Sequence, residues 1–227
     1  MNIDFNLHCL PNLDYNCDDY QGAQRILNQL KACYIKSAVL TPFYNPSRES
    51  VSSFLSRRRS ELSKLNSNNV ELIPAATIPL IDGISMTKGL NKLTVNKTEF
   101  IYLTLPLKFE PAVYDSEIHK LMYQEHLIPI LSDFDIAISL YEDNELYKIL
   151  NTPYVAFQVN ISSLSNDIVF KTVKNLILQG RCVLFGTGIK DYSNRTPNYN
   201  IPIKKFEKIL GQPQFNYYML KCERIVR

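Results

Sequence analysis

The sequence predicts a single α/β domain in which parallel strands alternate with helices and close into a barrel. Seven short apolar runs, rich in β-branched and aromatic residues, recur along the chain. Their starts lie roughly 26–35 residues apart, which leaves room for a strand, a helix and two loops. The runs are continuously apolar, as strands buried on both faces of a parallel sheet are. No glycine-rich GxGxxG segment follows the first run, which disfavours an open dinucleotide-binding sheet.

Each of the seven apolar runs has about the length of a buried strand. The predicted strands are Asn2–His8, Ser37–Thr41, Glu71–Ile78, Phe100–Leu105, Ile128–Ser132, Tyr154–Asn160 and Cys182–Thr187. Most of the stretches between them have apolar residues at helical spacing. The predicted helices are Asp19–Tyr34, Ser47–Leu65, Tyr114–His126, Asp143–Leu150, Ile168–Gln179 and Ile203–Leu210.

The ends and faces of these helices carry further signals. Ser47 is the predicted N-cap of the second helix, whose apolar stripe lies opposite Arg57–Arg59, so we expect these arginines to form a solvated face. Gly180 is placed as the glycine that ends the helix before it. The stretch Asp82–Lys97 has little periodicity. The domain is predicted to span residues 1–227, with residues 212–227 as a C-terminal strand or extension.

Composition excludes several function classes. The chain has 227 residues, 45% of them hydrophobic and 21% charged, which suits a globular domain with its own core. A net charge of +3 without a basic stripe does not indicate nucleic-acid binding. Five cysteines without CxxC spacing predict reduced thiols in a cytoplasmic protein. We find neither a signal peptide pattern nor an apolar stretch long enough to span a membrane.

The chemistry of a β/α barrel lies at the carboxyl ends of its strands. In the first strand Asp4, Asn6 and His8 alternate, so an extended backbone would point all three to the same side. A carboxylate and an imidazole on one face can bind a divalent metal, whereas the amide between them is a poor ligand. This strand is therefore a working metal site, a damaged one, or only part of the core.

The strand ends resemble a known family. The segments IDFNLHCLPNLD, LTPFYN, FQVNISSLS and NRTP resemble motifs of the polymerase-and-histidinol-phosphatase (PHP) superfamily. Within it, the chain is most similar to bacterial manganese-dependent protein-tyrosine phosphatases of capsule and exopolysaccharide synthesis. The resemblance runs from Ile3 to about Leu210. It implies a distorted barrel of seven β/α units, which agrees with the count of apolar runs.

The metal-ligand positions are where this chain departs from the resemblance. Asp4 and His8 match the family, and Arg195 of its last motif remains. Asp133 stands where the family has a histidine. The other ligand positions have lost their histidine or carboxylate and carry Asn6, Phe43, Thr77, Thr104, Thr187 and Ile189.

These replacements bear directly on the expected cofactor. A multinuclear manganese site needs several anionic or imidazole ligands, and neither Phe43 nor Ile189 has a lone pair to donate. Without metals, no water is activated near neutral pH. We therefore expect no metal, or at most one weakly bound manganese-like ion held by Asp4, His8 and Asp133, with Asp14 or Asp135 in support.

The resemblance leaves two main functions open. The first is a catalytically degenerate phosphatase with a binding or regulatory role, whose partner would be a tyrosine kinase or another protein of a polysaccharide locus. The second is an active metal-dependent phosphatase or phosphoesterase of the protein-tyrosine phosphatase type, with Asp4, His8, Asp133 and Arg195 as its catalytic residues. A third function, as a scaffold subunit of an RNA-processing complex, is disfavoured by the balanced charge. The family also implies that the chain can form a homo-oligomer.

Overall fold

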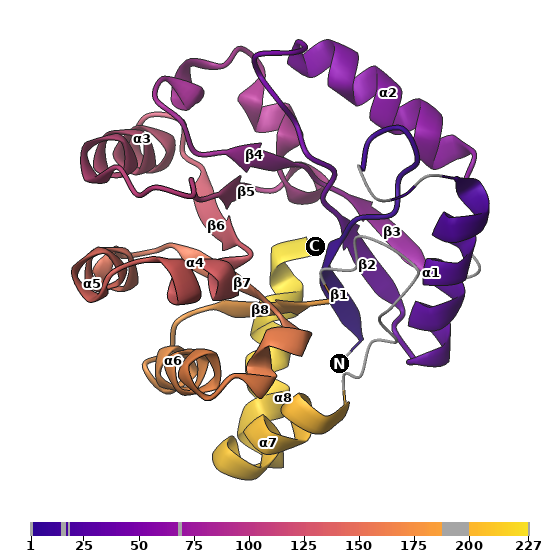
Figure 1. Cartoon of the computed structure of the whole chain (residues 1–227). Helices are drawn as coiled ribbons and strands as arrows, with labels where there is room; N and C mark the ends of the chain where they lie inside the picture. The colour runs from indigo at the N-terminus through magenta and orange to yellow at the C-terminus, as the bar shows by residue number, and fades with distance from the viewer. Residues whose placement is uncertain (1, 15–16, 18, 68–69, 188–199, 227) are drawn as a thin grey trace.

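All the strands of the computed structural model are parallel and lie in two sheets surrounded by helices (Figure 1). The structure describes residues 2–14, 17, 19–67, 70–187 and 200–226. The first sheet has the order β1 (Ile3–Leu7), β2 (Ser37–Leu40) and β3 (Glu71–Pro74). The second has the order β4 (Thr77–Pro79), β5 (Phe100–Thr104), β6 (Ile128–Ser132), β7 (Ala156–Asn160) and β8 (Val183–Gly186).

The predicted third strand, Glu71–Ile78, is in fact two strands in different sheets, so the prediction of one strand is wrong. The ladder between β2 and β3 ends at Leu40 and Pro74. Proline has no N–H to donate; Pro74 belongs to the last pair of this ladder, and Pro42 lies where the ladder would continue on β2. An isolated bridge between Phe43 and Thr77 follows, and β4 then pairs with β5.

The predicted closure into seven β/α units is not confirmed. The described residues contain eight strands, and their hydrogen-bond ladders form two sheets that do not close on each other. The ends of the two sheets nevertheless approach closely at Gly186 of β8. A Cβ on this residue would lie 2.7 Å from both the backbone nitrogen and the Cβ of Asn6, so only glycine fits there.

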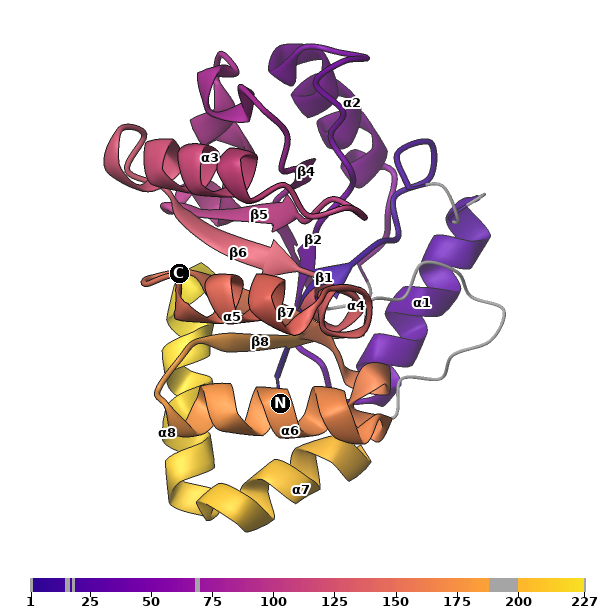
Figure 2. The same ribbon diagram turned by 60° about the vertical axis from the view of Figure 1, so that its left-hand side comes forward.

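The helices cover the outside of the strands (Figures 1 and 2). They are α1 (Tyr20–Ala32), α2 (Val51–Ser63), α3 (Pro111–Tyr123), α4 (Phe134–Leu140), α5 (Asp143–Asn151), α6 (Asp167–Leu178), α7 (Asn200–Leu210) and α8 (Gln212–Glu223). Short 3₁₀ segments are η1 (Ile84–Met86), η2 (Leu90–Leu93), η3 (Val95–Lys97), η4 (Ile161–Ser165) and η5 (Arg224–Val226). None of the helices in the described ranges is long and apolar enough to cross a membrane.

Capping explains where several helices begin and end. Helix α2 is capped by Ser50, whose hydroxyl accepts from the Ser53 backbone N–H at 3.2 Å. The prediction of Ser47 as N-cap is wrong, because its own N–H donates to the Asn45 side chain at 3.0 Å in a preceding turn. Gly180 follows α6 with φ of +74°, as expected for a glycine that ends a helix.

The C-terminal segment is helical, so the alternative of a C-terminal strand is wrong. Helix α8 and η5 lie at the amino ends of the strands, where Ile225 and Val226 are buried (Figure 2). These two residues join an inner apolar cluster formed by alternate strand residues, among them Phe5 and Tyr102. The Tyr102 hydroxyl crosses this interior and donates to the Phe5 carbonyl at 2.5 Å.

Replacing Tyr102 with Phe should lower the free energy of unfolding by about 1–3 kcal/mol, because the buried Phe5 carbonyl loses its donor. Urea denaturation followed by circular dichroism measures the change. Tyr147→Phe is the matched control, since the Tyr147 side chain is exposed, and it should shift stability by less than about 0.5 kcal/mol. Equal stability of the Tyr102→Phe variant and the parent would contradict the assigned role.

Candidate functional site

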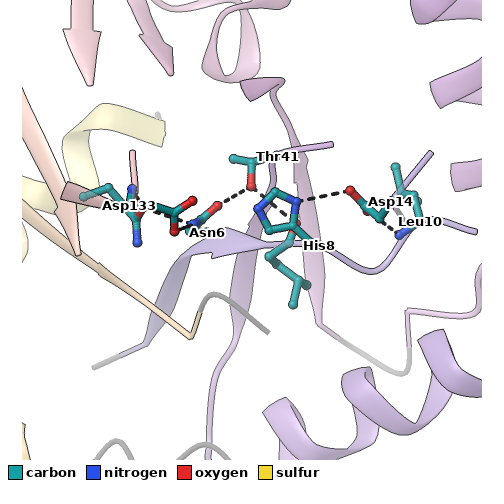
Figure 3. Close-up of polar contacts among 8 residues, drawn as sticks. Asn6, His8, Leu10, Asp14, Thr41 and Asp133 are labelled. Atoms are coloured by element: carbon teal, nitrogen blue, oxygen red, sulfur yellow. Dashed lines mark hydrogen bonds and ion pairs between the residues drawn. The ribbon is translucent and has the colours of Figure 1, made fainter. Parts of the chain in front are cut away.

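A buried amide, Asn6, lies at the centre of the polar cluster at the carboxyl ends of the strands (Figure 3). Its Nδ2 donates to Gln158 Oε1 at 3.0 Å and to Asp133 Oδ1 at 3.3 Å. Its Oδ1 accepts from Thr41 Oγ1 at 2.5 Å. The side chain thus joins β1, β2, β7 and the turn after β6 through hydrogen bonds alone.

Asp4 is fully buried and faces the end of β8. Its Oδ1 accepts from the backbone N–H groups of Asn6 at 3.0 Å and Thr187 at 3.1 Å. Its Oδ2 accepts from Thr187 Oγ1 at 2.7 Å. These three donors stabilise the carboxylate and link the two sheets where Gly186 meets Asn6.

His8 lies on the other side of Thr41 from Asn6 (Figure 3). Its Nδ1 is 3.1 Å from Asp14 Oδ1, and Asp14 Oδ2 accepts from the Leu10 backbone N–H at 2.8 Å. The ladder between β1 and β2 is irregular between Asp4 and Leu7, so β1 does not alternate regularly here. Asp4, Asn6 and His8 therefore bind three different sets of partners, although their spacing predicts one shared face.

Asp133 occupies the left-handed turn that starts α4, with φ of +50°. Its carboxylate accepts from Asn6 and from Asn160 Nδ2, the latter at 2.8 Å, and its backbone N–H donates to Gln158 Oε1 at 2.8 Å. The retained segment FQVNISSLS therefore supplies the amides that fix this turn. The structure brings Asp133 and Asn6 together, as expected for residues at the carboxyl ends of the strands. They form a hydrogen bond in which Asn6 donates to Asp133.

Asp135, two residues further on, is a buried carboxylate that the sequence offers only as a supporting ligand of a weakly bound ion. It accepts from the Asn160 backbone N–H at 2.9 Å and from Ser163 Oγ at 2.5 Å. Burial raises the pKa of Asp135, and the nearby Asp133 adds to the rise, although bonds from Ser163 and Asn160 oppose it. The pairing of Asp135 with the QVNISS segment could have been found only from the fold.

Hydroxyls and an aromatic ring occupy the remaining ligand positions of the resemblance. Thr104 Oγ1 lies 3.1 Å from Ser132 Oγ. Thr77 Oγ1 is buried and has no hydrogen-bond partner among the described residues. Phe43 lies beside Thr77 through an isolated backbone bridge. The predicted Arg195 falls outside the described residues.

These side chains do not fit a multinuclear manganese centre. No three His, Cys, Asp or Glu residues in the described ranges gather as a ligand set. Asp4, His8 and Asp133 each bind a different protein partner, and amide and hydroxyl groups are poor substitutes for bridging carboxylates. The geometry can accept and donate hydrogen bonds, but it offers no cluster of anionic ligands.

A cavity of about 450 Å³ lies beside the His8–Asp14 pair. Its lining consists of Asn12, Leu13, Asp14, Phe43, Asn45, Arg48, Glu49 and Arg57. Arg57 binds the Glu49 carboxylate through Nη2 at 2.6 Å and Nε at 3.2 Å, and its Nη1 donates to the Asn12 carbonyl at 3.3 Å. The cavity thus combines guanidinium, amide and aromatic groups at the mouth of the site.

The arginine run forms its predicted solvated face only in part, because Arg57 and Arg59 are exposed whereas Arg58 is not. Arg57 lines the cavity, and Arg58 is half-buried and donates to the Ala75 carbonyl at 2.5 Å. Burial lowers the pKa of Arg58 to about 10, and Arg59 adds to the shift. Only Arg57 of the three lines the cavity. The run of three arginines in the sequence could not show which of them lines the cavity and which is half-buried, because this depends on how α2 packs in the fold.

The comparisons with known proteins agree with these motifs. The family model for capsular polysaccharide synthesis proteins of the CpsB/CapC type matches residues 2–225. A solved chain from the work on YwqE of Bacillus subtilis and CpsB of Streptococcus pneumoniae, described as metal-dependent tyrosine phosphatases, matches with a TM-score of 0.75 and 16% identity. That match covers 98% of this chain and 94% of the solved chain, and it confirms the predicted fold relationship.

Two further results complete the comparison. A DAHP synthase of Thermotoga maritima matches with a TM-score of 0.47 and 9% identity, over 94% of this chain and 70% of the other. No curated protein matches the chain significantly.

Replacing Asn6 with Asp should destabilise the protein by at least about 1–3 kcal/mol near neutral pH, because a carboxylate oxygen would face Gln158 Oε1 and Asp133 Oδ1. Urea denaturation near pH 7 and near pH 4 measures the effect. The loss of stability should be smaller near pH 4, where protonation removes the repulsion between carboxylates. The exposed change Asn91→Asp is the control and should alter stability little at either pH. An Asn6→Asp variant as stable as its parent would contradict the assigned contacts.

Proposed function

Because the chain belongs to the CpsB/CapC family of capsular polysaccharide synthesis proteins, we propose that it is a catalytically degenerate member of that family with a binding or regulatory role. The hydrogen bonds of Asn6 carry this proposal. They hold an amide at the position where the family has its first metal-binding histidine. In this role the protein would recognise the kind of group that its relatives hydrolyse and leave it intact.

The surviving acidic and imidazole groups support the same view. Asp4 receives three hydrogen bonds from the Asn6 and Thr187 segments, and His8 is oriented by Asp14. To bind a metal, Asp4 and His8 would have to give up these hydrogen bonds, and the groups that make them would remain buried without this partner. Water activation by a metal cluster, the step that would make a hydroxide near neutral pH, therefore lacks support in this donor set.

The cavity beside His8 is the part of the site that we assign to binding. Arg48 and Arg57 provide guanidinium groups, Asn12 and Asn45 provide amides, and Phe43 provides an aromatic face. A phosphate would have to compete with Glu49 for Arg57. Guanidinium groups bind phosphate oxygens through charge-assisted hydrogen bonds. We assign this cavity to a phosphotyrosine-bearing segment of a protein partner, with a tyrosine kinase or another polysaccharide-locus protein in the cytoplasm as the partner class.

An active phosphatase with a reduced metal site is the second candidate. One observation favours it: His8 uses Nδ1 for Asp14, and the same Asp14 lines the cavity, so the imidazole lies next to the proposed ligand. In this alternative Asp4, His8 and Asp133 would hold a single ion and Arg195 would bind the phosphate. Activity would then depend on both Asp4 and His8.

Binding of a fluorescent phosphotyrosine peptide tests the proposed role. Arg57→Ala should weaken binding about tenfold, since one charge-assisted contact contributes on the order of 1.4 kcal/mol. Arg59→Ala is the matched control, because this neighbour is exposed and does not line the cavity. Equal affinities for the two variants would contradict the assigned cavity.

The same peptide, incubated with manganese, separates the two candidates. We expect it to remain phosphorylated. Manganese-dependent hydrolysis that is lost in both Asp4→Ala and His8→Ala variants that keep their circular dichroism spectra would establish the active phosphatase instead.

A further inference from the structure

A second cavity, of about 370 Å³, lies at the amino ends of the strands, remote from the polar cluster. Helix α8 forms one wall, and the start of β8 and the end of α6 form others (Figure 2). Two thiols, Cys182 before β8 and Cys222 on α8, belong to its lining. Neither thiol takes part in the proposed binding site.

Helix α8 is fixed to β8 around these thiols. The Tyr218 hydroxyl accepts from the Val183 backbone N–H at 2.6 Å and donates to its carbonyl at 2.8 Å. One helical turn later, the Cys222 thiol donates to the same carbonyl at 3.6 Å. Residues four apart lie on one face of a helix, so this face of α8 packs onto the residue that follows Cys182.

The two thiols line the same cavity, and the carbonyl that accepts from Cys222 belongs to Val183, the residue next to Cys182. The neighbouring Cys182 raises the pKa of Cys222, and burial raises it further. Cys222 is 1% exposed, whereas Cys182 is only half-buried and packs against the cluster that contains Cys222. An oxidant that enters from solvent therefore reaches Cys182 first, and Cys222 lies next to it.

We propose that Cys182 and Cys222 form an oxidation-sensitive dithiol that closes to an intramolecular disulfide on reaction with a hydroperoxide. Closure would tie α8, and with it the buried η5, to the start of β8. The disulfide would be a redox modification at the end of the fold opposite the phosphotyrosine site.

The reaction balances with one peroxide. The Cys182 thiolate attacks a peroxide oxygen, the O–O bond breaks, and the leaving hydroxide takes a proton to become water. The resulting sulfenic acid is attacked by the Cys222 sulfur, which loses its proton as the S–S bond forms and the S–O bond breaks, releasing a second water. Two thiols lose two electrons, and hydrogen peroxide is reduced to two waters.

The other described cysteines are poorer candidates for this chemistry. Cys9 and Cys17 are buried, and burial raises the pKa of Cys9, so the reactive thiolate is scarce there. Cys33, which caps the end of α1, is half-buried like Cys182. It therefore serves as a control of matched exposure.

Peptide mapping of the full chain after treatment with hydrogen peroxide tests the proposal. Free thiols are alkylated, the protein is digested with trypsin without reductant, and the peptides are identified by mass spectrometry. We expect a linked pair consisting of CVLFGTGIK, which contains Cys182, and CER, which contains Cys222, and we expect dithiothreitol to separate it. Cys33→Ser should leave the yield of this pair unchanged.

Variants assign the order of attack. Cys182→Ser should abolish the linked pair and leave Cys222 alkylated, whereas Cys222→Ser should leave Cys182 as a sulfenic acid that dimedone captures. Recovery of both wild-type cysteines as alkylated thiols, at a peroxide dose that oxidises Cys33, would overturn the proposal. So would a Cys182 that ends as sulfinic acid, or as a disulfide between two chains.

Discussion

The hydrogen bonds of the Asn6 amide connect the carboxyl ends of strands that come from both sheets. A buried amide is tolerated only where its donors and acceptors find partners, and Thr41, Asp133 and Gln158 supply them. The same contacts hold the Asp133 turn in its left-handed conformation. The polar cluster is therefore a mutually satisfied network, and removing one member takes a hydrogen bond from several others.

This network gives the segment FQVNISSLS, which resembles a motif of the family, a structural role. Gln158 and Asn160 do not need a metal to be useful, because they position Asp133 and Asp135 through hydrogen bonds. The chain can keep the architecture of a CpsB/CapC protein while the donor set at its centre changes from imidazole and carboxylate to amide and hydroxyl. Recognition of a phosphorylated segment would then depend on the neighbouring arginine-lined cavity.

The periodicity of apolar residues predicted most helices and strands. It failed at positions where prolines or turns determine the backbone. Continuous apolar runs predicted β6 with its observed bounds and the other strands to within a few residues, because buried parallel strands have few alternatives. The split at Ala75 comes after the pair between Leu40 and Pro74, with Pro42 just beyond it, and one segment alone cannot show this pairing. Helix α4 is too short to display a period.

The sequence indicates where part of the polar cluster lies but not its contacts. His8 and Asp133 follow the carboxyl ends of β1 and β6, whereas Asp4 is the second residue of β1. The register of β1 is irregular between Asp4 and Leu7, and within this segment Asp4 accepts from the Asn6 backbone N–H, a contact that the alternation of residue types does not reveal. The cavity and the thiol pair both depend on packing between segments far apart in the chain.

The central claim is that hydrogen bonds, and not cations, occupy the former ligand positions. Counting manganese bound per chain by inductively coupled plasma mass spectrometry, after saturation with manganese and removal of the free ion, tests it most directly. We predict well below one ion per chain, because amide and hydroxyl donors are weak ligands for this metal. Two or more tightly retained ions per chain would contradict the claim.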